Sequence, residues 1–449
     1  FKMKTALIAL LGLAGTAFAG EMGVLMQMKT ALRQSERAAG VFARGKYRSK
    51  NKVPCRNGKA GEYSCGNVDL YSFLTHEQMG STTREGNDIW GWAYRGREFG
   101  AVGQTDGTAF VEVNSDGSLT YIGRLPTQTE PSIWRDVKVI NGYLYVGSEA
   151  AGHGLQIFDM RKLLAVRPNP RRSFQPKTFS IETDLTAWFQ GFGSSHNIVA
   201  NEATNMIYAV GTSETLPCAG GLFMVDVRNP ARPTSPGCAS EDGYVHDAQC
   251  VIYRGPDFKY RGKEICFNYN EDTLTIVDVT NKAAPKQISR TPYVGASYTH
   301  QGWLVSDSHD FLLLDDELDE LRGNGTAANG HTTTYIFDIK NLAAPKHSGT
   351  FQSPVKSIDH NQYVINGLSY QSNYGSGLRI KDVRSIPRFP DGSKVTEVGF
   401  FDVHPEDDAE GGVVEFFGSW SVYPYFRSGY ILLNSIERGV YSLKYTGRR

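Results

Sequence analysis

The feature that most constrains the fold is a short motif that recurs along the chain. Each copy is a run of apolar residues that ends in aspartate and one further apolar residue, as in residues 222–227 (LFMVDV) and 274–279 (LTIVDV). The aspartates of five copies, at positions 159, 226, 278, 338 and 382, lie 44 to 67 residues apart. A repeat with this period indicates an array of similar β-units.

Each copy of the motif is surrounded by further strand signals. Upstream, residues 137–140 and 143–147 are joined by Asn141-Gly142, which is the preferred sequence of a two-residue hairpin turn. Downstream, an X-Pro break such as Ala284-Pro285 precedes another short strand. Each unit therefore reads as four antiparallel strands, which is the blade of a β-propeller.

The number of units is seven, and the ring they form has a predicted closing strand. The last unit has only three clear strands, and residues 68–74 (VDLYSFL) can supply its missing outer strand. Such a closure removes an open sheet edge. We therefore predict an all-β fold over residues 67–449: a seven-bladed β-propeller of four-stranded antiparallel blades, closed by strand 68–74. The first strands of the units start near Asp88, Asp136, His196, His246, His300, His360 and Trp420.

The N-terminal residues have a different character. Met3-Lys4, the apolar stretch 6–17 and the small-residue site at 17–19 are typical of a secretory signal peptide over residues 1–19. The apolar stretch is too short to cross a bilayer, so no transmembrane segment is expected in the mature chain. Residues 20–66 form a basic arm, helical or irregular, for which the roles of propeptide, packing helix and assembly arm all remain open.

The cysteines agree with secretion and an extracellular or cell-surface location. Six cysteines are compatible with three disulfides in an oxidising compartment. Asn324 begins the sequon Asn-Gly-Thr and is a candidate glycosylation site. Lys+Arg and Asp+Glu are equal at 47 each, so no overall field favours nucleic acid as a partner. By proximity we pair Cys55 with Cys65, Cys218 with Cys238, and Cys250 with Cys266.

Histidines recur at the start of the predicted inner strands, which line the central channel. His196, His246, His300 and His360 occupy equivalent positions on four consecutive blades. The loops between the second and third strands lie on the same face and carry acidic residues. We expect these carboxylates to be supporting groups or additional ligands. In these loops they are Glu149, Glu214, Asp272, Asp315, Asp316 and Glu317. Four aspartates at the starts of the inner strands are expected to act in the same way: Asp88, Asp136, Asp247 and Asp359.

This combination of residue types points to a divalent metal at the channel mouth. Neutral imidazole suits zinc, iron, copper or manganese, and carboxylates can orient such ligands or join them. Two alternatives stay open: calcium held through the carboxylates, and a metal-free channel in which the polar groups bond to one another. The acidic run 315–320 could be a calcium ligand set or a solvated loop, and it lacks the spacing of an EF-hand.

Several longer motifs resemble one protein family. Residues 134–139 (WRDVKV), 298–303 (YTHQGW) and 357–363 (SIDHNQY) are similar to those of LVIVD-repeat proteins, specifically the secreted choice-of-anchor B family. The resemblance runs from about Val68 to the C-terminus. It implies an extracellular or surface-attached propeller, and it implies no agreed activity.

Two functional hypotheses follow from these residues. In the first, the chain is a secreted binding or assembly module with a metal ion at the channel mouth, recognising an extracellular ligand or a self-assembly partner. In the second, it is a metal-dependent hydrolase, hydratase or oxidoreductase acting on a small substrate. The two differ in whether the ion keeps an open coordination position. We favour the binding module because no nucleophile or base is singled out. Trp90, Trp92, Trp303 and Trp420 are expected to pack between blades rather than to bind sugars.

Overall fold

The structure is a computed structural model, which describes residues 21–166, 174–213 and 217–447 of the 449-residue chain. Two compact units are distinguished, residues 1–46 and residues 47–449. The first contains one long helix, α2 (Glu21–Ala38), in which the Arg33 guanidinium pairs with the Glu36 carboxylate at 2.5 Å. The predicted signal peptide, 1–19, lies outside the described residues.

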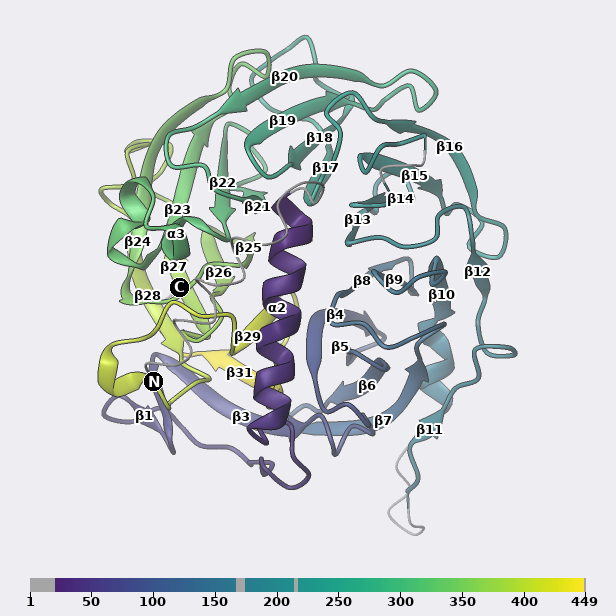
Figure 1. Cartoon of the computed structure of the whole chain (residues 1–449), viewed down its shortest axis with the longest axis vertical. Coiled ribbons are helices and arrows are strands. Elements are labelled where there is room, and N and C mark those ends of the chain that lie inside the picture. The colour runs from purple at the N-terminus through teal and green to yellow at the C-terminus, as the bar shows by residue number, and fades with distance from the viewer. Residues whose placement is uncertain (1–20, 167–173, 214–216, 448–449) are drawn as a thin grey trace. The chain divides into compact units, whose positions relative to one another are not determined.

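The described part of the second unit is a seven-bladed β-propeller of four-stranded antiparallel blades. The blades follow one another around a ring, with their first strands innermost (Figure 1). These inner strands are β4 (Gly86–Tyr94), β8 (Arg135–Ile140), β13 (Asn197–Asn201), β17 (Asp247–Ile252), β21 (Thr299–Leu304), β25 (Asn361–Ile365) and β29 (Ser419–Tyr423).

The predicted hairpin joins the first strand of the second blade to its second strand, and the repeat motif lies on the third strands. Asn141 and Gly142 connect β8 to the next strand with φ of 50° and 80°, the left-handed conformations that a tight hairpin turn requires. The second strands are β5 (Arg97–Gln104), β9 (Tyr143–Ser148), β14 (Met206–Val210), β18 (Glu264–Tyr269), β22 (Phe311–Asp316), β26 (Leu368–Ser372) and β30 (Tyr430–Ser435). The third strands are β6 (Gly107–Val113), β10 (Leu155–Asp159), β15 (Leu222–Asp226), β19 (Thr273–Asp278), β23 (His331–Asp338), β27 (Leu378–Asp382) and β31 (Gly439–Tyr445).

The aspartate of the motif ends the third strand and shapes the turn that follows it. The carboxylate of Asp278 accepts a hydrogen bond from the backbone amide of Thr280, two residues on. The same contact recurs at Asp159, Asp226, Asp338 and Asp382. Side-chain acceptance from residue i+2 is an Asx turn, so the repeated aspartate directs the chain toward the outer strand.

The outer strands complete the blades, and one of them closes the ring. The strand expected at 68–74 is β3 (Val68–Thr75), which pairs antiparallel with β31 and is therefore the outer strand of the last blade. The others are β7 (Leu119–Pro126), β12 (Ala187–Phe189), β16 (Thr234–Ala239), β20 (Lys286–Pro292), β24 (Lys346–Lys356) and β28 (Thr396–Phe401).

Some elements lie outside this four-strand scheme. Residues 47–66, which the sequence placed in the N-terminal arm, belong to the propeller unit because β2 (Tyr63–Gly66) pairs with β28. Two-residue strands β1 (Lys59–Ala60) and β11 (Lys177–Thr178) extend the sixth and first blades. The described helices of this unit are α3 (Asp319–Arg322) and 3-10 turns at Met160–Ala165, Gly325–Asn329 and Asp408–Glu410.

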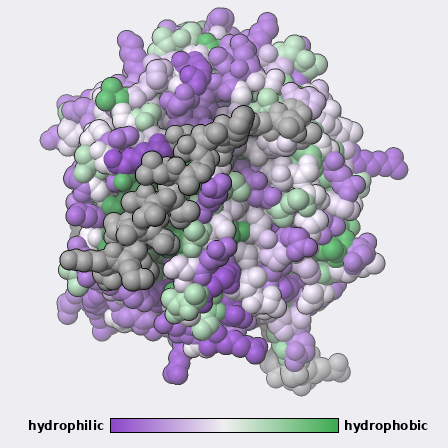
Figure 2. Space-filling view, in the orientation of Figure 1, coloured by the Kyte–Doolittle hydropathy of each residue, from purple (hydrophilic) through white to green (hydrophobic). Residues whose placement is uncertain are grey.

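Apolar side chains fill the spaces between neighbouring blades. Phe110 of the first blade stacks on Phe158 of the second, with ring centroids 5.2 Å apart, and both are fully buried. Burial of such faces between sheets is the main stabilising term of an all-β domain. On the face drawn in Figure 2, hydrophilic side chains are spread widely and apolar ones form only small patches.

The cysteine predictions are mostly confirmed. Disulfides join Cys55 to Cys65 and Cys250 to Cys266, the latter across paired strands β17 and β18. The third predicted bond is not formed, and Cys218 and Cys238 are thiols. Burial and a hydrogen bond with the Cys238 thiol raise the pKa of Cys218. At the candidate glycosylation site, the Asn324 amide donates to the Ser297 hydroxyl at 2.5 Å.

Candidate metal centre and aromatic pocket

The four predicted histidines lie side by side where the inner strands of four consecutive blades begin. The ring centroids of His196 and His246 are 4.4 Å apart, those of His246 and His300 are 4.1 Å apart, and those of His300 and His360 are 4.4 Å apart. All four are buried. We call this end of the inner strands the histidine mouth.

Hydrogen bonds between blades fix the orientation of three of these rings. The Nδ1 atom of His246 lies 2.8 Å from the carbonyl oxygen of His300, and that of His300 lies 3.0 Å from the carbonyl oxygen of His360. His360 repeats the contact with the carbonyl of Trp420 at 2.5 Å. A carbonyl oxygen can only accept, so each Nδ1 carries the proton and donates it. The Nε2 atom then holds the lone pair that a metal ligand needs.

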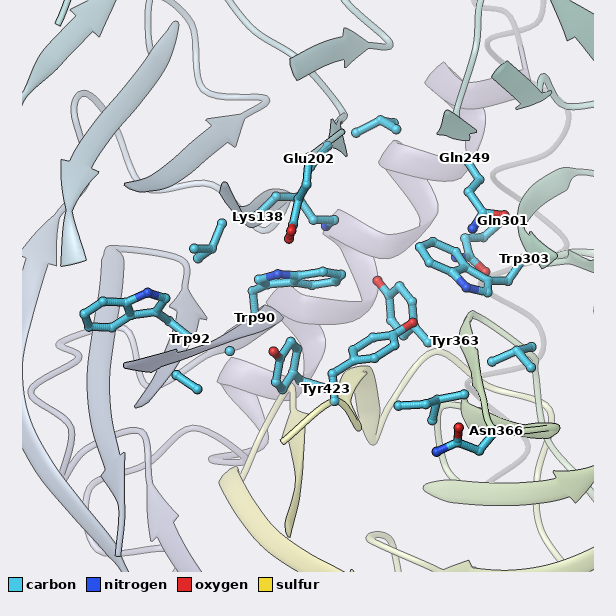
Figure 3. A pocket seen from close by; sticks show the side chains of 18 of the residues that line it. Trp90, Trp92, Lys138, Glu202, Gln249, Gln301, Trp303, Tyr363, Asn366 and Tyr423 are labelled. Carbon is cyan, nitrogen blue, oxygen red and sulfur yellow. The ribbon is translucent and has the colours of Figure 1, made fainter. Parts of the chain in front are cut away.

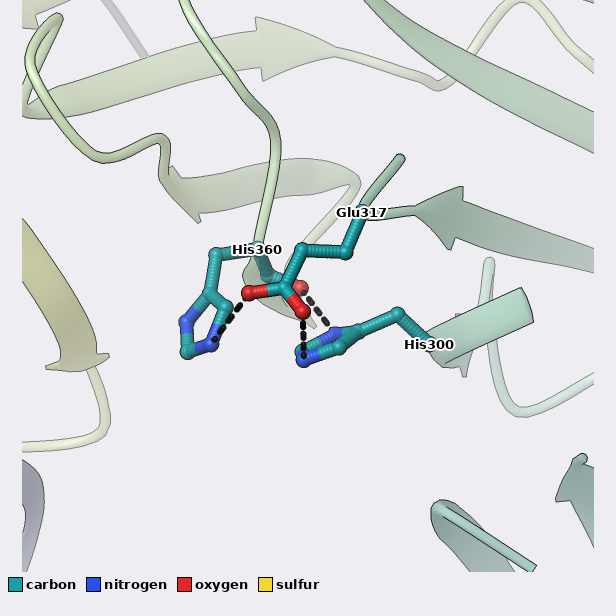
Figure 4. A group of neighbouring side chains, drawn as sticks. All are labelled: His300, Glu317 and His360. Atoms are coloured by element: carbon teal, nitrogen blue, oxygen red, sulfur yellow. Dashed lines mark hydrogen bonds and ion pairs between the residues drawn. The ribbon is translucent and has the colours of Figure 1, made fainter. Parts of the chain in front are cut away.

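Glu317 lies between two of the rings. One of its oxygens is 3.6 Å from the Nε2 atom of His360 and the other is 3.9 Å from that of His300. Figure 4 shows the carboxylate directed at both imidazoles. The hydroxyl of Tyr374 donates to Oε1 at 2.5 Å. Among the described residues, His300, Glu317 and His360 form the one group that could hold a metal ion, with ligand atoms all within 4.8 Å of one another.

His196 and His246 stand beside this group rather than in it. The Nδ1 atom of His196 is 3.0 Å from the carboxylate of Glu149. Burial raises the pKa of Glu149 to about 7. His246 lies against His300 with the two rings tilted by 41°, so it is a neighbour of the three-residue group. The structure therefore brings together the four histidines and two of the predicted carboxylates, but only three of these six residues converge on one point.

Two predicted carboxylates bind a lysine instead. Lys138 pairs with Asp136 at 2.5 Å and with Asp88 at 3.1 Å. Asp88 also accepts from the backbone amide of Val137 in the next blade, and Asp136 accepts from that of Ile198 in the blade after. These aspartates therefore connect neighbouring inner strands and pair with Lys138 rather than with the histidines.

Two other predicted acidic residues also lie apart from the histidine group. Asp247 is partly buried near Lys138 and lines the pocket at the other end of the inner strands. Loss of solvation raises its pKa to about 7 against the opposing effect of the lysine. Asp272 is largely exposed and forms a salt bridge with Arg290 at 2.6 Å. Glu214 lies outside the described residues.

The remaining predicted carboxylates belong to a second group, which we call the acidic cluster. Asp315 and Asp316 end β22, Asp319 and Glu320 begin α3, and Asp359 precedes β25 in the next blade. All five are at most 5% exposed, so the run 315–320 is not a solvated loop. Burial raises the pKa of Asp359, and the charges of Glu320, Asp315, Asp319 and Asp316 raise it further.

A pocket of about 1000 Å³ lies toward the opposite ends of the inner strands. Aromatic side chains of Trp90, Trp303, Tyr363 and Tyr423 line it together with polar groups such as Gln301 (Figure 3). Trp90 contacts Tyr363 and Tyr423 edge-on, and Trp303 contacts Tyr363. We call this the aromatic pocket. All seven inner strands contribute to its lining.

The four tryptophans differ in burial and in surroundings, which the sequence alone could not show. Trp92 and Trp420 are buried. Trp420 contacts His360 of the neighbouring blade, as predicted, whereas Trp92 stacks on Phe99 of its own blade and also lines the aromatic pocket. Trp90 and Trp303 are only partly buried and present surface to the aromatic pocket. Both also pack against tyrosines, so the expectation of packing describes only part of their environment.

Several residues of the histidine mouth and of the acidic cluster were not predicted from the sequence. Tyr374 was overlooked because a lone tyrosine in a Gly- and Ser-rich loop carries no chemical signal. Lys138 could have been found, because it follows Asp136 at the two-residue spacing that places side chains on one face of a strand. Asp319 and Glu320 were within the acidic run but were not assigned as ligands.

Comparisons with known proteins support the fold. A family model for the LVIVD repeat matches residues 267–291, which include β19. A solved chain of hydrazine synthase from Kuenenia stuttgartiensis is similar with a TM-score of 0.50 and 11% identity, covering 79% of this chain and 95% of that one. No match was found among curated protein sequences. Within the described residues, no helix combines the length and apolar character of a membrane span.

Proposed function

We propose that this chain is a secreted LVIVD-repeat propeller of the choice-of-anchor B type, acting as a binding module that contains a divalent transition metal. The observation that carries the metal assignment is the set of hydrogen bonds between blades at His300 and His360. These bonds direct both Nε2 atoms toward Glu317. Two imidazoles and one carboxylate suit zinc, iron, copper or manganese.

Two features support secretion. Disulfides persist in oxidising compartments and are rare in the cytosol, and two are formed here. The sequence pattern of residues 1–19 is the second. Non-reducing peptide mapping of the protein isolated from its native source would test this part of the proposal, and recovery of all six cysteines as free thiols would contradict it.

The metal assignment is tested by elemental analysis of purified protein after dialysis against trace metals. We expect about one transition-metal ion per chain in the native protein and less than a tenth of that in the double variant His300→Ala, His360→Ala. His347→Ala is the matched control, because His347 is exposed and its imidazole hydrogen-bonds to the nearby carbonyl of Gly349. Absence of stoichiometric metal in the native protein would refute the assignment.

The aromatic pocket is the place where we expect a ligand to bind. Partly exposed aromatic faces beside side-chain amides and carboxylates, such as Trp303 beside Gln301, suit sugars, whose C–H faces stack on rings while their hydroxyls hydrogen-bond. Titration with a panel of mono- and oligosaccharides should quench tryptophan fluorescence. Trp303→Ala should abolish the response, whereas Trp188→Ala should not, because Trp188 is exposed elsewhere.

The metalloenzyme alternative makes a different prediction about the same ion. A catalytic metal keeps a coordination position open to water or substrate. Cobalt can replace the bound ion, and azide added to the cobalt protein changes the visible spectrum when such a position is open. We expect no change for a binding module. A saturable spectral change would favour the enzyme.

A further inference from the structure

The two cations that line the aromatic pocket, Lys138 and Arg161, already have partners within the protein. The Lys138 ammonium is held by the carboxylates of Asp136 at 2.5 Å and of Asp88 at 3.1 Å. The Arg161 guanidinium is held by the carboxylate of Asp159 at 2.7 Å. Neither cation therefore needs a charged group from a ligand.

The carboxylates that line the same pocket are in a different situation. They belong to Glu202, Asp247 and Asp307. Among the described residues, no lysine, arginine or histidine forms a salt bridge with any of the three; Asp247 lies near Lys138, but that lysine is bound by two other carboxylates. Figure 3 shows the Glu202 carboxylate directed into the pocket. The pocket therefore presents more negative than positive charge to a ligand.

These three carboxylates lie at two levels of the pocket. Inner strands begin at the histidine mouth, and Asp247 is the first residue of β17. Glu202 follows the last residue of β13 directly, and Asp307 lies three residues beyond the end of β21. A strand rises about 3.3 Å per residue, so a strand of the length of β13 separates the two levels by roughly 15 Å. A ligand that contacts both levels is therefore elongated.

The aromatic rings of the pocket already bind one positive charge. The Lys138 Nζ atom lies 5.0 Å from the centroid of the Trp90 ring. The same ring lies 5.4 Å from those of Tyr363 and Tyr423, measured between centroids. The face of an aromatic ring attracts an ammonium group, and tryptophan does so most strongly. Aromatic rings and unpaired carboxylates in one cavity together favour an organic cation.

We propose that the ligand of the aromatic pocket is an oligosaccharide with protonated amines, such as an oligomer of glucosamine. This inference rests on the proposed function, which places a sugar in the same pocket. The sugar rings stack on Trp90 and Trp303, while the ammonium groups meet carboxylates at the two levels. A neutral sugar displaces water from these carboxylates without supplying a countercharge, which is unfavourable. A sugar acid adds a further negative charge and is rejected.

Binding is tested by isothermal titration of the full chain with three trisaccharides of the same linkage, at neutral pH and low ionic strength. The trimers are built from glucosamine, N-acetylglucosamine and glucose, so that only the first is charged. We expect the glucosamine trimer to bind at least about tenfold more tightly than the other two. Added sodium chloride should reduce this difference, because salt screens the exposed carboxylates of Glu202 and Asp307.

Two conservative variants test whether the carboxylates cause the preference. Glu202→Gln and Asp247→Asn remove the charge but keep the size of the side chain, and the new amide oxygen at position 247 can still accept from the backbone amide of Ala248. Each variant should remove most of the preference for the glucosamine trimer over the glucose trimer. Glu182→Gln is the matched control, because Glu182 is exposed and lies outside the pocket, and it should bind as the native protein does.

The outcomes separate this inference from the proposed function on which it rests. Equal affinities for the glucosamine and glucose trimers overturn the inference but leave sugar binding in place. A preference that persists undiminished in both variants also overturns it, because the carboxylates are then not its cause. If none of the three trimers binds, sugar binding in this pocket is refuted together with the inference, and the metal assignment at the histidine mouth is unaffected.

Discussion

The Nδ1 atom of His300 lies 3.0 Å from the main-chain oxygen of His360 in the next blade. This contact means that the position of one blade sets the tautomer of a side chain on its neighbour. The donated proton places the lone pair of His300 on Nε2, the atom nearest to Glu317. The register between blades is therefore part of the chemistry of the histidine mouth.

Tyr374 should strengthen metal binding without being a ligand. Its hydroxyl donates to Glu317 at 2.5 Å and holds the carboxylate against the imidazoles. Loss of such a supporting hydrogen bond typically weakens metal binding 10- to 100-fold, so we expect this range for Tyr374→Phe, measured by competition with a chromophoric chelator. Tyr441→Phe removes another buried hydroxyl, one that contacts Tyr63, and should leave metal affinity unchanged. Equal affinities in all three proteins would contradict the role of Tyr374.

The stability of the propeller should depend on pH through Asp402. Burial raises its pKa to about 6, and Arg379 only partly opposes this. The folded state therefore holds the proton more tightly than the unfolded state. The resulting stabilisation is complete below the ordinary aspartate pKa near 4 and is lost as pH rises through about 6. It amounts to about 3 kcal/mol from a shift of roughly two units. Urea unfolding from pH 4 to 7 should show a shallower fall in stability for Asp402→Asn than for the native protein.

The thiols of Cys218 and Cys238 should form the third disulfide when the protein is oxidised. Each thiol is close enough to affect the other, and both lie in a chain whose remaining cysteines are paired. Peptide mapping before and after exposure to oxidised glutathione should reveal the linked peptides. Recovery of both residues as alkylated thiols after prolonged oxidation would show that the pair is kept reduced.

The repeated aspartate should stabilise the folded chain through the hydrogen bond to its side-chain oxygen as well as through its charge. Asp278→Ala removes the acceptor for the Thr280 amide and the partner of Lys263, and should cost about 1 kcal/mol of stability. Asp278→Asn keeps an acceptor oxygen and should cost clearly less, since the ion pair with Lys263 is partly exposed. Chemical denaturation measures both, and equal losses would indicate that charge alone matters.

The propeller was predictable from sequence because its determinants are local. The two-residue alternation of strands, the Asn141-Gly142 turn and the aspartate-terminated motif each act within a few residues. The boundary near residue 47 was not predictable, because it depends on β2 pairing with β28, more than three hundred residues away. Short strands without a repeat motif give no indication of such a partner.

The candidate site was predictable only in outline. Equivalent register on successive blades was enough to place His300 beside His360. It could not distinguish Asp136, which binds Lys138, from Glu317, which faces the imidazoles. That difference depends on side-chain direction and on which cation is in reach, and neither is encoded in spacing along the chain. The burial of residues 315–320 likewise depends on tertiary packing, which brings α3 against β23.

The pairing of β3 with β31 has a consequence for how the protein is made. β3 precedes all seven inner strands in the chain but has its partner in the last blade, so the sheet that joins them cannot form until the ribosome has nearly finished the chain. Until then, β3 has no partner strand while the other blades form. Contacts of such sequence separation slow folding. Truncation shortly before residue 439 would therefore leave an open ring, however many blades had already formed.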